Sequence, residues 1–382
     1  MKMEVSESVG PAAGATSRIG SGRRSAAKTL MRSRIARDLQ QRSSADSAIK
    51  TVKPLTSSWR TLDPFVLCVH HDDHFPSANK QMGPAASLDD RNIGNDFSGK
   101  DGWSMYHGDV VPGFPAHPHI GFEIVTVLRQ GTIDHFDSSN ATARYGSGDV
   151  QWITAGQGMQ HSEMFPLLDR RRPNPLELFQ IWLNLPHASK RELPNFQMLW
   201  RHQIPHKISH DETGRTTEIT VVAGELDDAK ASTPPPKSWA SRADTHVAIW
   251  IIKMAPNATW TLPRTEAGLN RALYFHRGGF LKIEDVSVQS GHLIELEPGC
   301  DAHLRNSGEA AQLLFLQGRP IGEPVVARGP FVMNSLDEIQ RAVAEYGRTQ
   351  FGGWPWPSPA PLHPREALRF ARYPDGRIER PR

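Results

Sequence analysis

From Trp59 onward, the chain follows the hydrophobic pattern of short β-strands. Runs of β-branched and aromatic residues alternate with clusters of Gly, Pro, Asn and Asp, roughly every 8 to 12 residues, as in all-β sandwiches and barrels. The clearest strands predicted in the first half span residues 122–128, 132–136, 149–154 and 176–183. Strands should therefore dominate this part of the chain.

A second group of strand patterns follows in the second half. These strands are predicted at residues 218–222, 247–254, 271–276, 292–296 and 312–317. The two groups are similar, and 382 residues exceed what one hydrophobic core usually organises. Two β-barrels in tandem are the natural solution, because a closed barrel leaves no unpaired strand edge. We therefore expect an all-β fold and a monomer.

The pattern becomes helical only near the C-terminus. Apolar residues there recur three and four positions apart, at Leu336, Ile339, Ala342, Val343 and Tyr346. Ser335 is the expected N-cap, with Glu338 three residues later as in a capping box. The remaining tail is rich in Pro and Trp, so it must be extended.

The first 58 residues differ in composition from the rest. They are rich in Ser, Ala, Gly and Arg and contain no aromatic residue, so they cannot bury enough apolar surface to order themselves. A loose helical repeat within residues 26–39 is an alternative, resembling a transit peptide. The predicted organisation is a flexible basic arm (1–58), a first barrel (59–212), a second barrel (213–334), and a C-terminal helix and tail (335–382).

Charge and cysteine content exclude several classes of protein. The net charge is +3, but the first fifty residues hold ten Lys and Arg against four acids, so the remainder is slightly acidic and offers no nucleic-acid groove. Two distant cysteines provide neither a disulfide scaffold nor a thiolate zinc site. No apolar stretch approaches the roughly 18 residues of a membrane span. We expect a cytoplasmic protein, with nuclear or organellar location as the alternatives in a eukaryote.

Two short motifs could carry chemistry. They are His117-Pro-His119 and, about forty residues later, His161-Ser-Glu163. Residues two apart on a strand point to the same face, so two such pairs on facing strands could converge on one point. Three imidazoles and a carboxylate suit a divalent first-row metal, iron foremost, although zinc would also bind.

Spacing alone leaves other interpretations open. Interior histidines with ordinary hydrogen bonds would explain each pair separately. Glu123 follows His119 at even spacing, so it could face the same cavity or orient a ligand. The run His70-His-Asp-Asp-His74 opens a long segment that ends near Trp103. We interpret this segment as a solvated polar loop, with a lid or a second metal cluster as alternatives.

Longer strings around the two motifs resemble the signature blocks of the pirins, a branch of the cupin superfamily. The blocks are Phe-Pro-Ala-His-Pro-His-Ile-Gly-Phe-Glu at residues 114–123 and Gly-Asp-Val-Gln-Trp-Ile-Thr-Ala-Gly-Gln-Gly-Met-Gln-His-Ser-Glu-Met at residues 148–164. Further similar blocks lie at residues 62–65, 182–186, 320–326, 329–334 and 348–356. The resemblance runs from about residue 62 to the end and excludes the arm.

The resemblance implies a bicupin, with two tandem jelly-roll barrels. The first would bind one Fe(II), with Zn, Mn, Cu and Ni as other candidate metals, through His117, His119, His161 and Glu163. The second would have lost its metal. The later histidines agree, because His246, His276 and His303 form no pair two apart. No second metal site is therefore expected.

The resemblance also implies two alternative functions. One is a dioxygenase that opens flavonols such as quercetin with O2, where Glu163 would accept the proton of the substrate hydroxyl. The other is a non-enzymatic co-regulator whose iron oxidation state tunes binding to a transcription factor. A third reading is a zinc-binding barrel that holds a small molecule without turnover. Ile120 stands where pirins usually carry Arg, so preferences taken from relatives carry less weight.

Overall fold

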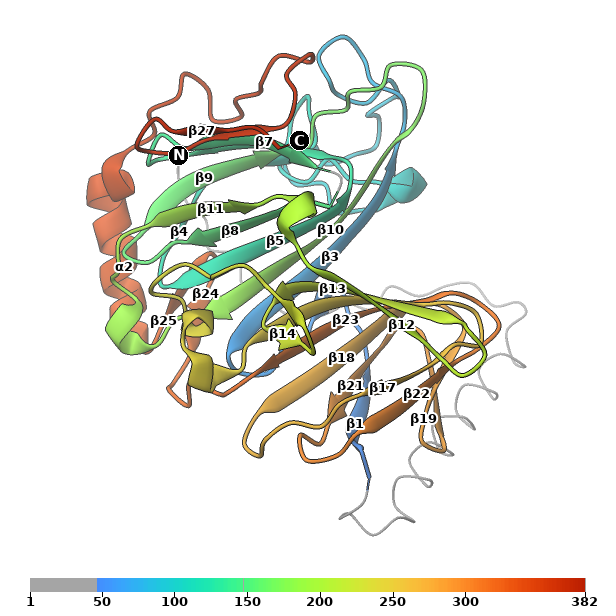
Figure 1. Cartoon of the computed structure of the whole chain (residues 1–382). Coiled ribbons are helices and arrows are strands. Elements are labelled where there is room, and N and C mark those ends of the chain that lie inside the picture. The colour runs from blue at the N-terminus through green and yellow to red at the C-terminus, as the bar shows by residue number, and fades with distance from the viewer. Residues whose placement is uncertain (1–46, 147, 382) are drawn as a thin grey trace, which may run out of the picture. The chain divides into compact units, whose positions relative to one another are not determined.

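The computed structural model of the chain describes residues 47–146 and 148–381, and strands dominate them (Figure 1). The prediction of an all-β fold with two tandem barrels is confirmed. Residues 1–46, which include most of the predicted arm and the transit-peptide alternative, lie outside the described residues.

The first barrel consists of two six-stranded sheets, which we call sheets I and II. Sheet I contains, in spatial order, β27 (Ile378–Glu379), β26 (Phe370–Arg372), β7 (Thr142–Gly146), β6 (Thr132–Asp137), β9 (Met159–Met164) and β4 (Gly113–His119). Sheet II contains β11 (Asn195–Leu199), β8 (Val150–Thr154), β5 (Phe122–Gln130), β10 (Asn174–Asn184), β3 (Phe65–Phe75) and β2 (Ser58–Trp59).

The second barrel consists of a seven-stranded sheet III and a four-stranded sheet IV. Sheet III contains β1 (Ile49–Pro54), β21 (His292–Leu296), β18 (Asn270–Arg277), β23 (Ala311–Gly318), β16 (Ala248–Met254), β13 (Thr216–Ala223) and β12 (His206–His210). Sheet IV contains β17 (Thr259–Leu262), β22 (Ala302–Asn306), β19 (Phe280–Ile283) and β20 (Val286–Gln289).

Smaller elements connect the sheets. Two short hairpins are formed by β14 (Glu225–Leu226) with β15 (Ala229–Lys230), and by β24 (Val326–Arg328) with β25 (Phe331–Met333). The described residues also include an α-helix, α2 (Leu336–Thr349). Short 3-10 turns are η1 (Lys100–Gly102), η2 (His187–Ser189), η3 (Arg201–Gln203), η4 (Trp239–Ser241), η5 (Ala243–Thr245) and η6 (Gln350–Gly352).

Sheet II is buried on both of its faces. On β5, Ile124 belongs to the core between sheets I and II, whereas Val125 belongs to the core between sheets II and III. The two barrels therefore pack face to face through sheets II and III, and the interface is apolar. This explains why the sequence of β5 reads as a nearly continuous hydrophobic run instead of a strict alternation.

Each end of the described chain adds a strand to the barrel that is formed mainly by the other half of the chain (Figure 1). Near the N-terminus, β1 joins the second barrel by pairing with β21, where Thr51 lies opposite Glu295. Near the C-terminus, β26 joins the first barrel by pairing with β7. The predicted arm of residues 1–58 therefore ends too late, because residues 49–54 are already paired. Strand β12 belongs to sheet III, so the second barrel begins before the predicted boundary at residue 213.

The predicted C-terminal helix is confirmed, and so is its N-cap. The Ser335 hydroxyl accepts a hydrogen bond from the backbone N–H of Glu338. Beyond the helix, the tail is pinned along sheet I. The buried Arg144 donates to the carbonyl of Pro364 at 2.7 Å, and the Trp356 indole donates to the carbonyl of Asp137 at 2.8 Å. Among the described residues, no helix is long and apolar enough to cross a membrane.

The polar run at residues 70–74 lies in a strand, so its interpretation as a solvated loop is wrong. These residues belong to β3 and pair one by one with β10. Their side chains alternate between two environments. His71 and Asp73 turn into the first barrel, where they contact the Tyr106 hydroxyl at 2.8 and 2.6 Å. His70 and Asp72 point to the opposite face of the strand. The polar side chains of this run are therefore divided between the two faces of sheet II.

Candidate metal centre

Two neighbouring strands of sheet I carry the predicted ligands. Strands β4 and β9 pair antiparallel, with His117 opposite His161 and Phe114 opposite Glu163. Strand β4 has one extra residue between Phe114 and His117, a bulge that sets the register of the two histidines. Because side chains alternate along a strand, His119 shares the face of His117, and Glu163 shares that of His161.

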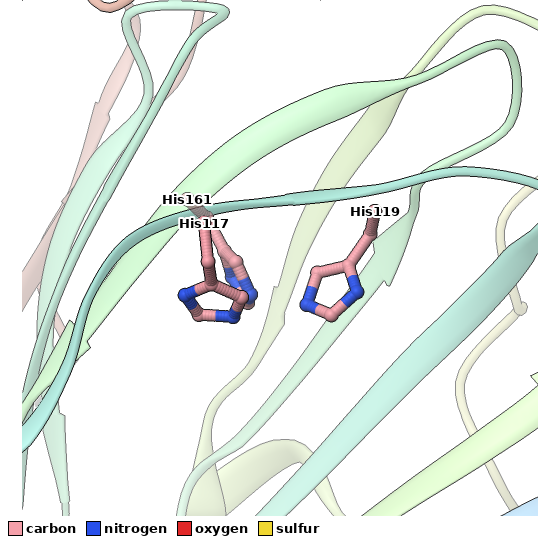
Figure 2. Close-up of side chains that lie close together, drawn as sticks. All are labelled: His117, His119 and His161. Carbon is pink, nitrogen blue, oxygen red and sulfur yellow. The ribbon is translucent and has the colours of Figure 1, made fainter. Parts of the chain in front are cut away.

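The structure brings the three predicted histidines together, and Figure 2 shows their rings gathered at one place. The ring centroids of His117 and His161 lie 4.5 Å apart, those of His117 and His119 4.7 Å, and those of His119 and His161 4.8 Å. One ring nitrogen from each lies within 4.8 Å of those of the other two. Three nitrogens can therefore face a common point.

Backbone carbonyls fix two of the rings. The Nδ1 of His117 donates to the carbonyl of Pro115 at 2.8 Å, and the Nδ1 of His119 donates to the carbonyl of Pro330 at 3.3 Å. A carbonyl can only accept, so these bonds place the proton on Nδ1 and leave the Nε2 lone pair free.

The third histidine has no protein partner. His161 is fully buried, and neither of its ring nitrogens has a hydrogen-bond partner among the described residues. Buried polar atoms without a partner are costly and rare. Coordination of a cation by His161 would remove part of this cost, so the donor set fits a metal ion.

Burial keeps the three imidazoles neutral. It lowers the pKa of His117 to about 4, and it lowers the pKa values of His119 and His161 well below the usual range. Neighbouring histidines add to the effect on the last two. Neutral imidazole is the form that binds metals, so at neutral pH these side chains need not lose a proton first.

Glu163 lies at the edge of the three-histidine cluster. Its Oε1 accepts a hydrogen bond from the Thr126 hydroxyl at 3.2 Å, and its Oε2 accepts one from the Gln180 amide at 2.7 Å. The same Oε2 is 3.8 Å from the Nε2 of His161. Burial raises the pKa of Glu163, and a cation beside it would favour the carboxylate.

The sequence interpretation missed Thr126 and Gln180. Each is a polar residue between two apolar neighbours, on β5 and β10 respectively, and both point into the first barrel toward Glu163. A polar residue at an inward-facing position of a strand, between apolar neighbours, was the signal in the sequence that could have indicated these two residues.

Glu123 does not face this cavity, so the first of the two alternatives given for it is wrong. Its carboxylate accepts hydrogen bonds from the Thr154 hydroxyl at 2.7 Å and from the Ser238 hydroxyl. Ser238 belongs to the segment before the second barrel's strand β16. The even spacing from His119 fails because Gly121 interrupts the strand with a φ of 88°. Alternation does not carry across such a turn.

A buried histidine–carboxylate pair lies behind His161. On β6, Asp137 pairs with His161, and His135 pairs with Glu163. The Nε2 of His135 is 3.2 Å from a carboxylate oxygen of Asp137, and the His135 ring centroid is 5.6 Å from that of His161. Both residues of the pair are fully buried. They form a second layer that fixes the position of β9 beneath the cluster.

The segment after the second barrel supports the cluster from outside. Gln160, next to His161 on β9, accepts from the Tyr346 hydroxyl at 3.1 Å and donates to the carbonyl of Gln350 at 2.8 Å. Helix α2 and turn η6 thereby hold β9 in place.

Ile120 lies in the same contact region and has no exposed surface. It packs with Phe331, Met333, Ile339 and Ala342, beneath helix α2. Ile120, which stands where the resembled family usually has Arg, therefore lies in a small core that joins the first barrel to the C-terminal helix.

Comparison with known proteins agrees with this architecture. Residues 47–183 match the family described as Pirin, and residues 249–352 match the Pirin C-terminal cupin domain. A Pseudomonas aeruginosa protein with the provisional name quercetin 2,3-dioxygenase is 33% identical over 248 residues, or 63% of this chain and 79% of that protein. Pirin-1 of Arabidopsis thaliana is 34% identical over 242 residues, or 63% of this chain and 78% of that protein.

A solved structure shows the same fold. The crystal structure of a quercetin 2,3-dioxygenase from Acinetobacter baumannii superposes with a TM-score of 0.63 at 25% identity. It covers 81% of this chain and 99% of that chain. The likeness therefore extends over both barrels.

Proposed function

The chain belongs to the pirin family, and from this premise we propose that it is an iron-dependent dioxygenase that cleaves flavonols such as quercetin with O2. The observation that carries the proposal is the convergence of three neutral imidazoles, two of them buried and that of His117 partly buried, next to a buried carboxylate. The names of the relatives from Pseudomonas aeruginosa and Acinetobacter baumannii support the choice of reaction.

Four side chains would hold the iron. His117 and His119 would bind through the Nε2 atoms that their backbone hydrogen bonds leave free, His161 through a ring nitrogen, and Glu163 through its carboxylate. Bound Fe(II) supplies a Lewis acid that lowers the pKa of a substrate hydroxyl and a redox partner for dioxygen.

Glu163 is the proposed acceptor of the substrate hydroxyl proton. Burial raises the pKa of Glu163, whereas a bound cation would favour the carboxylate that accepts the proton. Thr126 and Gln180 hold one oxygen each, so the carboxyl group keeps its orientation when its charge changes. The proton would be taken up at Oε2, the oxygen nearer to His161.

Aromatic side chains flank the cluster on one side. The rings of Phe122 and Trp182 lie 5.2 and 5.5 Å from that of His119. They provide an apolar wall that would exclude water from the reacting hydroxyl. Phe122 has no exposed surface, so Trp182, which is partly buried, is the ring that would offer a surface to the flat rings of a flavonol.

The test is oxygen uptake after quercetin is added to full-length protein reconstituted anaerobically with Fe(II). We expect uptake that matches quercetin consumption. His119→Ala should lose both the iron and the uptake. His303→Ala is the matched control, because His303 is exposed on β22 in sheet IV and should change neither.

A second variant separates iron binding from the proton role. Glu163→Gln protein that still holds iron should turn over at least tenfold more slowly, because general base catalysis contributes about 10²- to 10⁴-fold. Unchanged turnover with iron retained would remove the proton role from Glu163. No uptake by iron-loaded wild-type protein would overturn the enzyme proposal. The co-regulator alternative would then be tested by comparing partners captured by reduced, oxidised and apo protein.

A further inference from the structure

We propose that the chain has a second metal site, formed between the two barrels by His70, Glu177 and His276, which takes a borderline-soft divalent cation such as Zn²⁺. The inference goes beyond the proposed function, because none of these residues belongs to the first cluster. It also revises the expectation that no second site exists.

Two of the three side chains come from the first barrel. His70 on β3 and Glu177 on β10 lie on neighbouring strands of sheet II, and both face sheet III. The alternation along each strand shows this. Cys68, two residues before His70, and Phe179, two residues after Glu177, both belong to the core between sheets II and III.

The third side chain comes from the second barrel through a β-bulge. On β18, Phe275 pairs with Leu313 and Arg277 pairs with Gln312, so His276 is the extra residue between them. Bulges commonly re-aim a side chain next to a functional site. Here the bulge places the His276 ring centroid 4.8 Å from that of His70.

The ligand atoms of these three residues converge. The Nε2 of His70 is 3.2 Å from a carboxylate oxygen of Glu177, and one ligand atom from each residue lies within 4.8 Å of the other two. Both ring nitrogens of His276 are buried and have no partner among the described residues. As at His161, coordination would satisfy a nitrogen that the protein leaves unpaired.

The surroundings favour retention of a bound ion. Phe179 stacks on His70 with ring centroids 4.6 Å apart, and the Trp59 ring lies 5.8 Å from that of His276. Burial lowers the pKa of His276 to about 2, so this imidazole is neutral and its lone pair is available. Two imidazoles and one carboxylate leave one position for water, a donor set common at zinc.

Two arginines oppose a cation and limit its affinity. The Nη1 of Arg129 is 3.4 Å from Glu177, and the Nη2 of Arg277 is 4.0 Å away. Each has a shorter contact elsewhere, because Arg129 donates to Gln312 at 2.6 Å and Arg277 donates to Asp72 at 2.5 Å. Both can therefore keep a partner when Glu177 turns to a metal. The second site should bind more weakly than the first.

A metal at this position would join strands of sheets II and III. Its binding should therefore stabilise the packing of one barrel on the other, since a ligand that binds only the folded state raises the melting temperature.

The test counts zinc bound to full-length protein after equilibrium dialysis, with the metal measured by mass spectrometry. Wild-type protein should bind two ions per chain. His276→Ala and His119→Ala should each bind one, the double variant none, and the exposed-histidine control His303→Ala two. Zinc should also raise the melting temperature of His119→Ala but not that of the double variant.

The outcomes separate the two sites. If wild-type protein binds one ion that His276→Ala keeps and His119→Ala loses, the second site is refuted and the first stands. If the single ion shows the opposite pattern, the first site fails and the second stands. His70→Asn removes a ligand from the other barrel and should give the same count as His276→Ala. Should His276→Ala fail to fold by circular dichroism, a full count of two ions in His70→Asn would refute the proposal.

Discussion

Glu123 makes the stability of this protein depend on pH in a direction opposite to that of most carboxylates. Its side chain is fully buried on the face of sheet II that is turned away from the three-histidine cluster, and it accepts hydrogen bonds from the hydroxyls of Thr154 and Ser238. Burial raises its pKa from 4.5 to about 7, although the hydrogen bonds lower it in part. Between these two values the folded protein holds a proton that the unfolded chain releases. The free energy of unfolding therefore falls as pH rises through this range.

The size of the effect follows from the two pKa values. One pKa unit corresponds to about 1.4 kcal/mol, so from pH 5 to pH 8 the ionisation of Glu123 should cost the folded state about 2 to 3 kcal/mol. Glu123→Gln removes this cost, because glutamine keeps the shape of the protonated acid and does not ionise. The stability of the variant relative to wild type should therefore increase by about 2 to 3 kcal/mol between these pH values.

Urea unfolding of both proteins at a series of pH values, with a chelator present, measures this difference. The comparison cancels the buried histidines, which destabilise the fold as pH falls. Glu218→Gln is the matched control, since Glu218 is exposed on β13 and the same substitution there changes no buried group. A difference between Glu123→Gln and wild type that stays flat or shrinks from pH 5 to pH 8 would refute the reasoning.

Two further predictions concern the contact between the first barrel and the C-terminal segment. Ile120→Ala should lower the free energy of unfolding by about 2 to 5 kcal/mol in urea melts, because Ile120 has no exposed surface, whereas Ile208→Ala, at a 56% exposed position, should have little effect. Gly158→Ala should lower the free energy of unfolding by about 1 to 3 kcal/mol and weaken metal binding. The reason is that Gly158 has a φ of 120° and that a Cβ there would lie 2.6 Å from the Phe351 ring. Gly214→Ala, at a φ of 79° in open space, controls for backbone strain alone. Equal losses in the two glycine variants would contradict a role for the Phe351 contact.

Local periodicity was sufficient to predict which side chains of the two motifs share a strand face. His117 with His119, and His161 with Glu163, share strand faces because each pair lies within one strand, where alternation holds. Alternation failed for Glu123 because the turn at Gly121 separates it from His119. The alternation of side chains holds within one strand and is lost wherever the backbone leaves the extended conformation.

Contacts between distant segments could not be predicted in this way. In the sequence, residues 49–54 look like part of a polar arm. They form a strand because they pair with β21, which lies more than two hundred residues later. The approach of His276 to His70 and Glu177 depends on a bulge and on the packing of sheet III against sheet II. Neither the bulge nor the packing angle of two sheets is encoded in a short window of sequence.

The three-histidine cluster depends on residues far beyond the barrel that contains it. The carbonyl of Pro330 fixes the ring of His119, and Gln350 with Tyr346 holds the strand of His161 through Gln160. Strand β26 then extends sheet I beside β7. A fragment that ends after the first barrel would contain all four proposed ligands, yet it would lack the contacts that orient two of them. The segment after the second barrel therefore acts on the site by position, and the second barrel is the part of the chain that connects this segment to the first barrel.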